Sequence, residues 1–456
     1  MTILQPHPCI NFRRTVAILL LLVGICLANA APAVRYPRSN HRTRSDISYL
    51  MRYRGSLTLG YLNHDDKMDF YISRPVVLGG TVAVEFLPTG RWKCLQEWNN
   101  ASIGLALTAV DLGHNKFLGQ AIAPHAYFNI PLVNHPRAIF GLRPGAGVGF
   151  VTRTYANTVP DDQRWKNIKV NGEQIANASI GSIANAFMTA GFYFDFPFGD
   201  NWDVTLSFAW QHLSNASIMT PNGGYNMFNA EIGMAYTPKR KTQGFHHWEP
   251  DPLCYEGLYQ HVKKKWGIEL LVAGGVRSVY YKDRDWFGTA TVSLSGYWQP
   301  LAIFRIGLGA DFFYDGAYAA VCDEFAAEGN RHTTYFSKTY LSESRVTNCL
   351  RAGVSLQPEC IIGNFTFGYH IGLYLYDPVK NLEPYAAVKN NGGKPLNRGI
   401  FYAYNPLKSS TYQDGWCYQK IQLRYYCSEH FFFNLGLKLH FFKAENLDFG
   451  IGFRFT

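Results

Sequence analysis

Charged side chains are scarce in this chain of 456 residues. Asp, Glu, Lys and Arg make up 17% of it, whereas soluble domains carry roughly a quarter. Beyond residue 30 the chain also lacks a run of about 18 apolar residues, which excludes a helical membrane protein. Yet 47% of the residues are hydrophobic, which excludes intrinsic disorder because disordered chains combine low hydrophobicity with high charge.

Cysteine pairs with metal-ligand spacing are missing as well. Seven cysteines follow residue 30, an odd number that cannot pair completely, and none stands in a C-x-x-C arrangement. Neither a zinc site nor a full disulfide framework is therefore indicated, although one or two bridges in surface loops remain open. We expect no metal and no organic cofactor. The seven are Cys94, Cys254, Cys322, Cys349, Cys360, Cys417 and Cys427.

The first thirty residues have the pattern of an export signal. Arg13 and Arg14 precede an apolar stretch over residues 15–27, and residues 28–30 form a small-x-small cleavage site. The apolar stretch is too short to span a membrane as a helix. Residues 1–30 are therefore predicted to be a signal peptide.

The remaining chain is rich in aromatic residues (16%) and glycine, and it alternates. In the segment from Phe365 to Leu375 every odd position is apolar or aromatic, and the even positions hold Thr, Gly, His and Tyr. The same split recurs at residues 304–312 and 433–441. A strand with one face in hydrocarbon and the other toward a polar interior alternates in this way, whereas a soluble sandwich turns its apolar faces inward.

The final segment, residues 447–455, is the clearest example. Leu, Phe and Ile at its odd positions alternate with Asp, Gly and Arg, and the pattern resembles the assembly signal of bacterial outer-membrane barrels. Only closed barrels satisfy every strand hydrogen bond inside lipid. We therefore predict an all-β protein of the bacterial outer membrane, an antiparallel up-and-down transmembrane β-barrel.

The alternation divides the chain into two halves. About eight strands are expected in residues 31–238 and about eight more in residues 266–456. Residues 239–265 are basic and do not alternate, so we interpret them as a linker or an inserted loop. One barrel of about sixteen strands and two tandem eight-stranded units both fit, because each obeys the even strand number of bacterial barrels.

One hairpin carries polar residues on its outward face. From Trp202 to Trp210 the even positions are apolar or aromatic, and the same period places His212 and Ser214 outward. On the return strand Asn226 has the outward parity too. Polar side chains facing lipid are costly unless they lie near the headgroups or have a role. A short turn precedes the first strand, and short turns usually face the periplasm, so His212 is expected at the extracellular rim.

These three side chains suit nucleophilic catalysis. A serine and a histidine two residues apart on one strand face, with an asparagine on the partner strand, supply a nucleophile, a base and an orienting group. Their substrate would be a lipid that lies against the barrel wall.

A family resemblance rests on the same hairpin. The stretch His-Leu-Ser-Asn-Ala at 212–216 and Pro-Asn-Gly-Gly-Tyr-Asn at 221–226 resemble the lipid A 3-O-deacylases (PagL type) of Gram-negative outer membranes. They are especially similar to the related group labelled acyloxyacyl hydrolases in the Bacteroidetes. The resemblance covers roughly residues 50–238. It implies an eight-stranded barrel that hydrolyses an ester-linked acyl chain of lipid A at a site on its outer wall.

The resemblance also implies roles for individual residues. Ser214 is then the nucleophile and His212 the general base, and Asn226 stands where the family has a glutamate. An asparagine can orient the imidazole but cannot stabilise the imidazolium by charge. Asn215 and Asn222 match family positions near the oxyanion, where side-chain amides are suitable donors.

The expected partner is lipid A, or lipopolysaccharide, in the outer leaflet, and no nucleic acid is expected. Cationic side chains of the segment 152–182 could meet its phosphates, or simply be solvated; they are Arg153, Arg164, Lys166 and Lys169. The alternative function is a non-catalytic outer-membrane barrel with a vestigial site, either a structural protein or a pore. Sixteen strands closing together would leave room for a channel.

Overall fold

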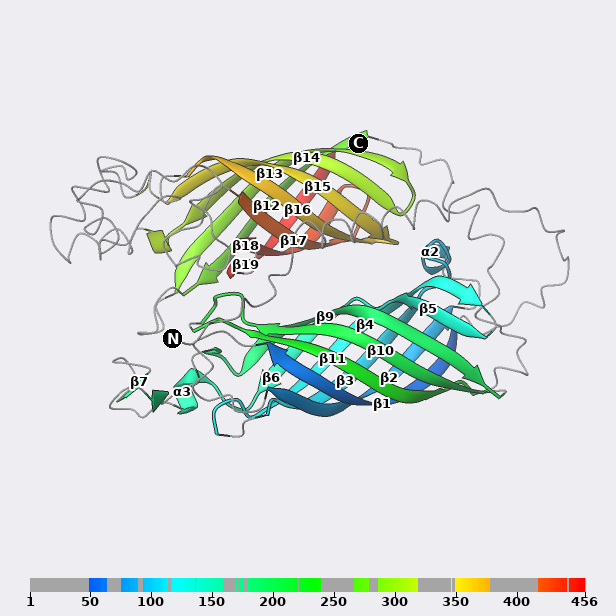
Figure 1. Cartoon of the computed structure of the whole chain (residues 1–456). Helices are drawn as coiled ribbons and strands as arrows, with labels where there is room; N and C mark the ends of the chain where they lie inside the picture. The colour runs from blue at the N-terminus through cyan, green and yellow to red at the C-terminus, as the bar shows by residue number, and fades with distance from the viewer. Residues whose placement is uncertain are drawn as a thin grey trace, which may run out of the picture.

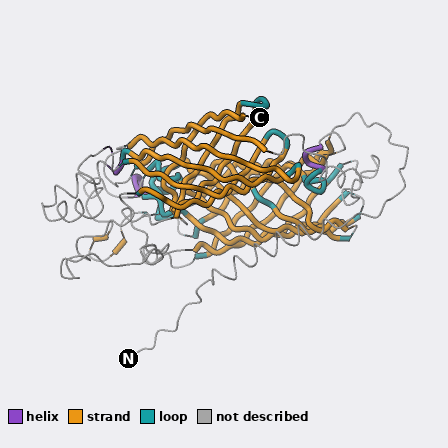
Figure 2. Tube along the Cα trace, turned by 90° about the horizontal axis from the view of Figure 1, so that it is seen from above, coloured by secondary structure: helices purple, strands orange, loops and turns teal. Residues whose placement is uncertain are grey.

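Strands make up most of the residues that the computed structural model describes (Figures 1 and 2). Among the residues it describes, no helix is long and apolar enough to cross a membrane. The predicted signal peptide and residues 239–265 lie outside the described residues. The structure describes residues 49–63, 75–88, 93–113, 116–135, 137–158, 169–170, 173–174, 177, 179–199, 201–219, 221–238, 266–278, 286–318, 346, 349–377, 417–440 and 443–455.

The N-terminal half closes into an antiparallel barrel whose ring has eight strand positions. β5 and β6 both pair with β4 and β9, so together they occupy one position, and Pro144, which has no N–H to donate, lies between them. The pairings β9–β10, β10–β11 and β11–β1 complete the ring. The strands are β1 (Tyr49–Asn63), β2 (Val76–Pro88), β3 (Ser102–Asp111), β4 (Gln120–His135), β5 (Ala138–Leu142), β6 (Gly145–Val151), β9 (Ala184–Phe198), β10 (Trp202–Ser214) and β11 (Tyr225–Tyr236).

The C-terminal half forms a second closed barrel of eight strands, in which β19 pairs back with β12. Its strands are β12 (Trp266–Arg277), β13 (Phe287–Leu301), β14 (Phe304–Asp315), β15 (Leu350–Ile362), β16 (Phe365–Tyr376), β17 (Cys417–Tyr426), β18 (Phe431–His440) and β19 (Lys443–Phe455). Of the two predicted architectures, the structure therefore has two tandem eight-stranded barrels, which Figure 1 shows as separate bodies. Short elements outside the barrels are the helices α2 (Lys93–Gln96) and α3 (Tyr155–Thr158) and the hairpin of β7 (Lys169–Val170) and β8 (Glu173–Gln174).

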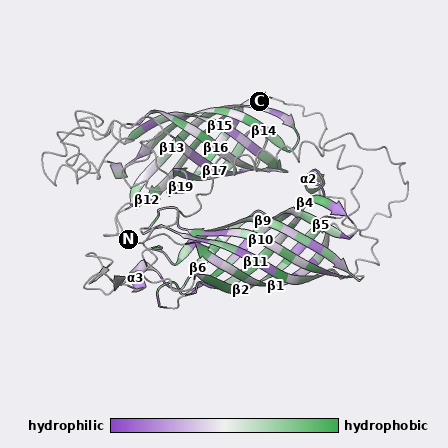
Figure 3. Ribbon diagram, viewed as in Figure 1, coloured by the Kyte–Doolittle hydropathy of each residue, from purple (hydrophilic) through white to green (hydrophobic). Residues whose placement is uncertain are grey.

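The predicted alternation is confirmed along the strands. In β16 the aromatic and aliphatic positions are exposed and the intervening Thr, Gly, His and Tyr positions are buried. In β1, Leu57 is 73% exposed, whereas Arg52 is 2% exposed. Hydrophobic and hydrophilic residues therefore alternate along the ribbons of both barrels (Figure 3). An apolar outer wall over a polar interior is the arrangement that a membrane-spanning barrel requires.

Ion pairs fill the interior of the first barrel. The Arg52 guanidinium lies 2.9 Å from Glu85, 2.8 Å from Asp195 and 3.2 Å from Asp203. All four side chains are buried, and such charges are tolerated in an interior only when they are paired.

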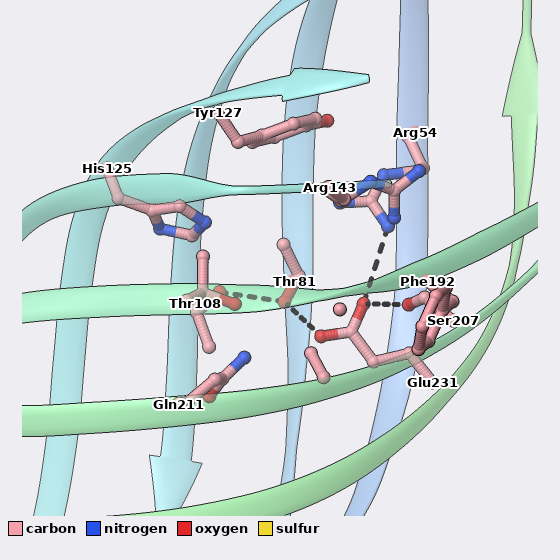
Figure 4. A pocket seen from close by; sticks show the side chains of 13 residues that line it. Arg54, Thr81, Thr108, His125, Tyr127, Arg143, Phe192, Ser207, Gln211 and Glu231 are labelled. Carbon is pink, nitrogen blue, oxygen red and sulfur yellow. Dashed lines mark hydrogen bonds and ion pairs between the residues drawn. The ribbon is translucent and has the colours of Figure 1, made fainter. Parts of the chain in front are cut away.

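A small polar pocket lies beside this cluster inside the same barrel (Figure 4). Glu231 accepts hydrogen bonds from Arg54 at 3.3 Å and from Ser207 at 3.1 Å, and Thr81 and Thr108 share one at 2.8 Å. These contacts occupy the lumen, as expected for an eight-stranded barrel whose interior is just wide enough for side chains.

The second barrel is filled in the same way. Glu269 binds Arg305 at 2.8 Å, Arg424 at 2.9 Å and Arg454 at 2.9 Å. The sixteen-stranded lumen that the pore hypothesis needed is therefore not what the chain forms. Disulfides, which the sequence left open, do not join any two of the five described cysteines, which are Cys94, Cys349, Cys360, Cys417 and Cys427. Cys254 and Cys322 lie outside the described residues.

Candidate active site

The polar residues of the outward face meet at one end of the hairpin formed by β10 and β11. His212 pairs directly with Asn226 across the two strands, and Trp210 pairs with Phe228. Trp202, Phe208 and Phe228 are exposed on the same face, and the intervening Asp203, Thr205, Ser207 and Gln211 are buried inside the barrel. The outward parity predicted for His212 and Asn226 is thus confirmed by the register and the burial pattern.

The imidazole of His212 is held by Asn226. Its Nδ1 lies 2.9 Å from Asn226 Oδ1, and the Trp210 indole Nε1 lies 3.2 Å from the same oxygen. The indole nitrogen can only donate a hydrogen bond, so the atom that faces both rings must be the amide oxygen. Nδ1 of His212 therefore carries the proton, which leaves Nε2 as an unprotonated nitrogen. The two rings stack with centroids 5.5 Å apart.

Ser214, at the end of β10, is 6% exposed and surrounded by the loop that follows it. Its hydroxyl donates to Asn222 Oδ1 at 3.0 Å, and the Asn215 N–H donates to the same oxygen at 3.0 Å. The backbone N–H of Ala216 in turn donates to Ser214 Oγ at 3.3 Å. In this resting arrangement the hydroxyl is turned toward Asn222 rather than toward His212.

The loop after Ser214 has an unusual backbone. Ala216 and Ser217 have φ values of 55° and 64°, in the left-handed region that residues with a Cβ rarely adopt. Gly224, on the other side of the loop, has φ 71°, and a Cβ there would lie 3.0 Å from His212 Cε1. Only glycine fits this position without strain and without displacing the imidazole.

A neighbouring segment fixes the loop from the barrel side. Asn215 Nδ2 donates to Ser182 Oγ at 2.8 Å, and Asn215 Oδ1 accepts from the Met219 N–H at 3.3 Å. The Gly224 N–H donates to the Ser179 carbonyl at 2.9 Å. Asn215 is therefore a loop anchor in this structure.

Sequence reasoning missed four of these residues: Trp210, Ser182, Gly224 and the backbone amide of Ala216. The Gly-Gly pair at 223–224 was the only local signal, since adjacent glycines mark tight turns. Ser182 and the Ala216 amide act through a distant segment and a backbone path, which no spacing within the hairpin reveals. Trp210 shares the outward parity of His212, so the period of two is the signal that could have found it.

Other predicted features lie at the edge of this region. Among the four cations of the segment 152–182, the structure describes the side chain of Arg153, whose carbonyl accepts from Asn177 Nδ2 at 3.0 Å. Asn177 also donates to Tyr225, the neighbour of Asn226, at 2.6 Å. Arg164 and Lys166 lie outside the described residues, as does the side chain of Lys169. In the part of the chain that the structure describes, no group of three or more His, Cys, Asp or Glu side chains is placed to hold a metal ion.

Each half of the chain matches the model of a known protein family. Residues 81–235 match the model described as lipid A 3-O-deacylase (PagL). Residues 266–387 and 397–456 match the model described as acyloxyacyl hydrolase, C-terminal domain. The first match contains His212, Ser214 and Asn226, and the second corresponds to the C-terminal barrel.

Solved structures give weaker likenesses. The outer-membrane enzyme PagL is 13% identical and aligns over 40% of this chain and 97% of its own, with a TM-score of 0.23. Neisserial surface protein A is 8% identical and aligns over 42% and 97%, with a TM-score of 0.24. A porin of Rhodopseudomonas blastica is 10% identical and aligns over 89% and 100%, with a TM-score of 0.16. Scores this low carry no further inference.

A search of curated proteins gave no significant match. The two family models, however, follow each other along the chain and together account for most of both barrels. The apolar outer walls and the polar, ion-paired interiors agree with a membrane-spanning barrel. The chain therefore belongs to the lipid A 3-O-deacylase (PagL) family and is an outer-membrane β-barrel enzyme of the ester hydrolase class.

Proposed function

We propose that this enzyme removes an ester-linked acyl chain from lipid A of lipopolysaccharide, or from a related acylated lipid, with Ser214 as its nucleophile. The observation that carries the proposal is the hydrogen bond between His212 and Asn226. It places the proton on Nδ1 and leaves Nε2 available as a base on the face that also carries Ser214. A serine hydrolase needs a base in this protonation state.

The first step is acylation of the serine. The Ser214 hydroxyl turns from Asn222 toward His212 and gives its proton to Nε2, while Oγ forms a bond to the ester carbonyl carbon. Hydrogen bonds of this kind are often long or misaligned before the substrate binds. Asn226 keeps the imidazole oriented throughout, although as a neutral amide it adds no charge to stabilise the imidazolium.

The carbonyl oxygen becomes an oxyanion that needs donors. The Ala216 N–H already points at Ser214 Oγ, and we assign it as the first donor. The amide nitrogen of Asn222 has no hydrogen-bond partner among the described residues, and we assign it as the second. Of the two asparagines expected near the oxyanion, Asn215 instead holds the loop through Ser182.

The tetrahedral intermediate then collapses. His212 returns its proton to the leaving sugar oxygen, the C–O ester bond breaks, and the deacylated lipid departs. A water molecule then gives a proton to His212 Nε2 and attacks the acyl carbon on Ser214. The bond between that carbon and Oγ breaks, Oγ takes the proton back from Nε2, and a fatty acid is released. Each proton thus passes through Nε2, and no cofactor is required.

The substrate is expected to approach from the membrane. Phe208 and Phe228, 54% and 52% exposed, lie next to the site on the outer wall and offer an apolar surface to acyl chains. Arg153 stands close to the hairpin through Asn177 and Tyr225 and is suited to a lipid A phosphate. We place this end of the barrel at the outer leaflet.

Mass spectrometry of lipid A tests the proposal. Cells that produce the wild-type chain should contain lipid A lacking one acyl chain, and cells that produce Ser214→Ala should contain the fully acylated form. Ser428→Ala, in an exposed turn at the opposite end of the second barrel, serves as the matched control and should behave as wild type. Identical acylation with wild type and Ser214→Ala would remove the catalytic role.

A non-catalytic barrel is favoured by one observation, the neutral Asn226 where the family has a carboxylate. As a pore, such a barrel would have to conduct ions, yet both described interiors are filled by paired charges. We expect almost no conductance in a planar bilayer. Substantial conductance, with unchanged lipid A, would establish the alternative.

A further inference from the structure

The loop that follows Ser214 contacts the second barrel as well as the first. The Ser217 hydroxyl donates to the Ala444 carbonyl at the start of β19, at 2.6 Å. The Ser278 N–H, just after β12, donates to the Ser217 carbonyl at 2.7 Å. The Trp286 indole, just before β13, donates to the Ile218 carbonyl at 3.1 Å. Three separate points of the second barrel thus converge on two consecutive residues of the loop.

These two residues follow directly after the proposed oxyanion donor. Ala216 and Ser217 both have positive φ values, and such a conformation persists only where the surroundings enforce it. Ser217 has both its carbonyl and its hydroxyl engaged by the second barrel. The direction of the Ala216 N–H depends on this backbone, because a rotation at Ala216 or Ser217 would change the path of the loop.

We propose that the C-terminal barrel is a positioning part of the active site, in which Ser278, Trp286 and Ala444 hold the loop in the conformation that aims the Ala216 N–H at the oxyanion. This inference rests on the proposed function, since it assigns a task to the loop only if Ser214 is the nucleophile. It gives the second barrel a role even though the described strands of its own wall carry no catalytic set.

The chain offers a matched control for this proposal. At the opposite end of the barrels a second indole, that of Trp98, donates to the Ile361 carbonyl of β15 at 2.9 Å. Trp98 and Trp286 thus make the same kind of bond between the two barrels, but only Trp286 bonds to the loop of the site. A role in merely joining the barrels would affect both positions alike.

The test compares Trp286→Phe with Trp98→Phe in the full-length protein, with purified lipopolysaccharide as substrate. Loss of one hydrogen bond corresponds to roughly a three- to tenfold effect. We expect Trp286→Phe to lower kcat by about that factor with little change in KM, because substrate binding on the wall is untouched. Trp98→Phe should leave both constants unchanged. Equal effects of the two substitutions, or no effect of Trp286→Phe, would overturn the proposal.

A second measurement does not depend on activity. The backbone bond between Ser217 and Ser278 brings these residues within the range of a disulfide, so Ser217→Cys with Ser278→Cys should cross-link under oxidation. The linked peptides can be identified by mass spectrometry. Ser217→Cys with Trp266→Cys, at the far end of β12, should not cross-link. Failure of the first pair to link overturns the docking itself. If the pair links but the wild-type protein does not hydrolyse lipopolysaccharide, the proposed function is rejected instead.

Discussion

The two barrels of this chain share an architecture and differ in their walls. Both close with eight antiparallel positions, and both bury paired charges such as Arg52 with Glu85 and Arg305 with Glu269. The first barrel carries His212, Ser214 and Asn226 on its outward face. Over the described strands β12–β19, the outward positions hold no serine, histidine or carboxylate. The barrel is therefore a common scaffold, and the proposed chemistry lies where polar residues interrupt the apolar wall.

The largest effect in the first barrel is expected at Gly224. Gly224→Ala introduces a Cβ at a positive φ, 3.0 Å from His212 Cε1 and 2.8 Å from the Leu213 carbonyl. A displacement of about 1 Å near the chemistry costs roughly a hundredfold in rate, so we expect a loss in kcat of that order. The measurement is hydrolysis of lipopolysaccharide by the purified variant.

The adjacent glycine provides the control. A Cβ at Gly223 would meet only the Ser179 backbone, at 3.7 Å and beyond, so Gly223→Ala should keep most of the activity. If both alanine variants were equally impaired, the close fit of Gly224 against the imidazole would not be the reason.

The next largest expected change is an increase in kcat. Asn226→Glu places a carboxylate beside His212 that stabilises the imidazolium formed during the reaction. We expect an increase in kcat of about tenfold or more, equivalent to about 1.4 kcal/mol or more. Asn226→Gln, which changes the length of the side chain but adds no charge, should give no gain. Equal rates for wild type and Asn226→Glu would indicate that charge at this position does not limit the enzyme.

The smallest change in kcat is expected for a substitution of Trp210. Trp210→Phe keeps an aromatic ring beside His212 but removes the N–H that fixes the amide of Asn226. Loss of one such hydrogen bond suggests a decrease in kcat of about three- to tenfold. Trp202→Phe, at the other end of the same strand, should have no effect. The Asn226→Glu background sharpens the test, because a carboxylate accepts through either oxygen and should make Trp210 dispensable.

Much of the fold could be predicted from the sequence because a strand in a membrane barrel has a period of two. That period predicts the faces of β16 and the outward parity of His212 and Asn226, and the structure confirms both. Ser214 pairs with the exposed Ala186 of β9, but its own side chain is buried. It could not distinguish one large barrel from two small ones, because the alternation is the same in both. The choice depends on which distant strands pair, here β11 with β1 and β19 with β12.

The site was predictable only where its residues lie on strands. His212 and Asn226 follow from the period of two, since both continue the outward positions of their own strands, and the register of β10 and β11 pairs them directly. The contacts of Ser182, the positive φ of Ala216 and the bonds from the second barrel depend on the path of loops, which side-chain periodicity does not describe. The sequence places Asn222 in the loop, but its orientation, with the oxygen toward Ser214, depends on the three-dimensional path of that loop.

The central claim is that a serine on the outer wall of the first barrel is the nucleophile. A fluorophosphonate probe that reacts covalently with activated serines tests it directly in the full-length protein, and peptide mass spectrometry locates the modified residue. The account predicts modification at Ser214, its loss in His212→Ala, and no modified serine in the second barrel. Modification of a different serine, or none in an enzyme that hydrolyses lipopolysaccharide, would contradict it.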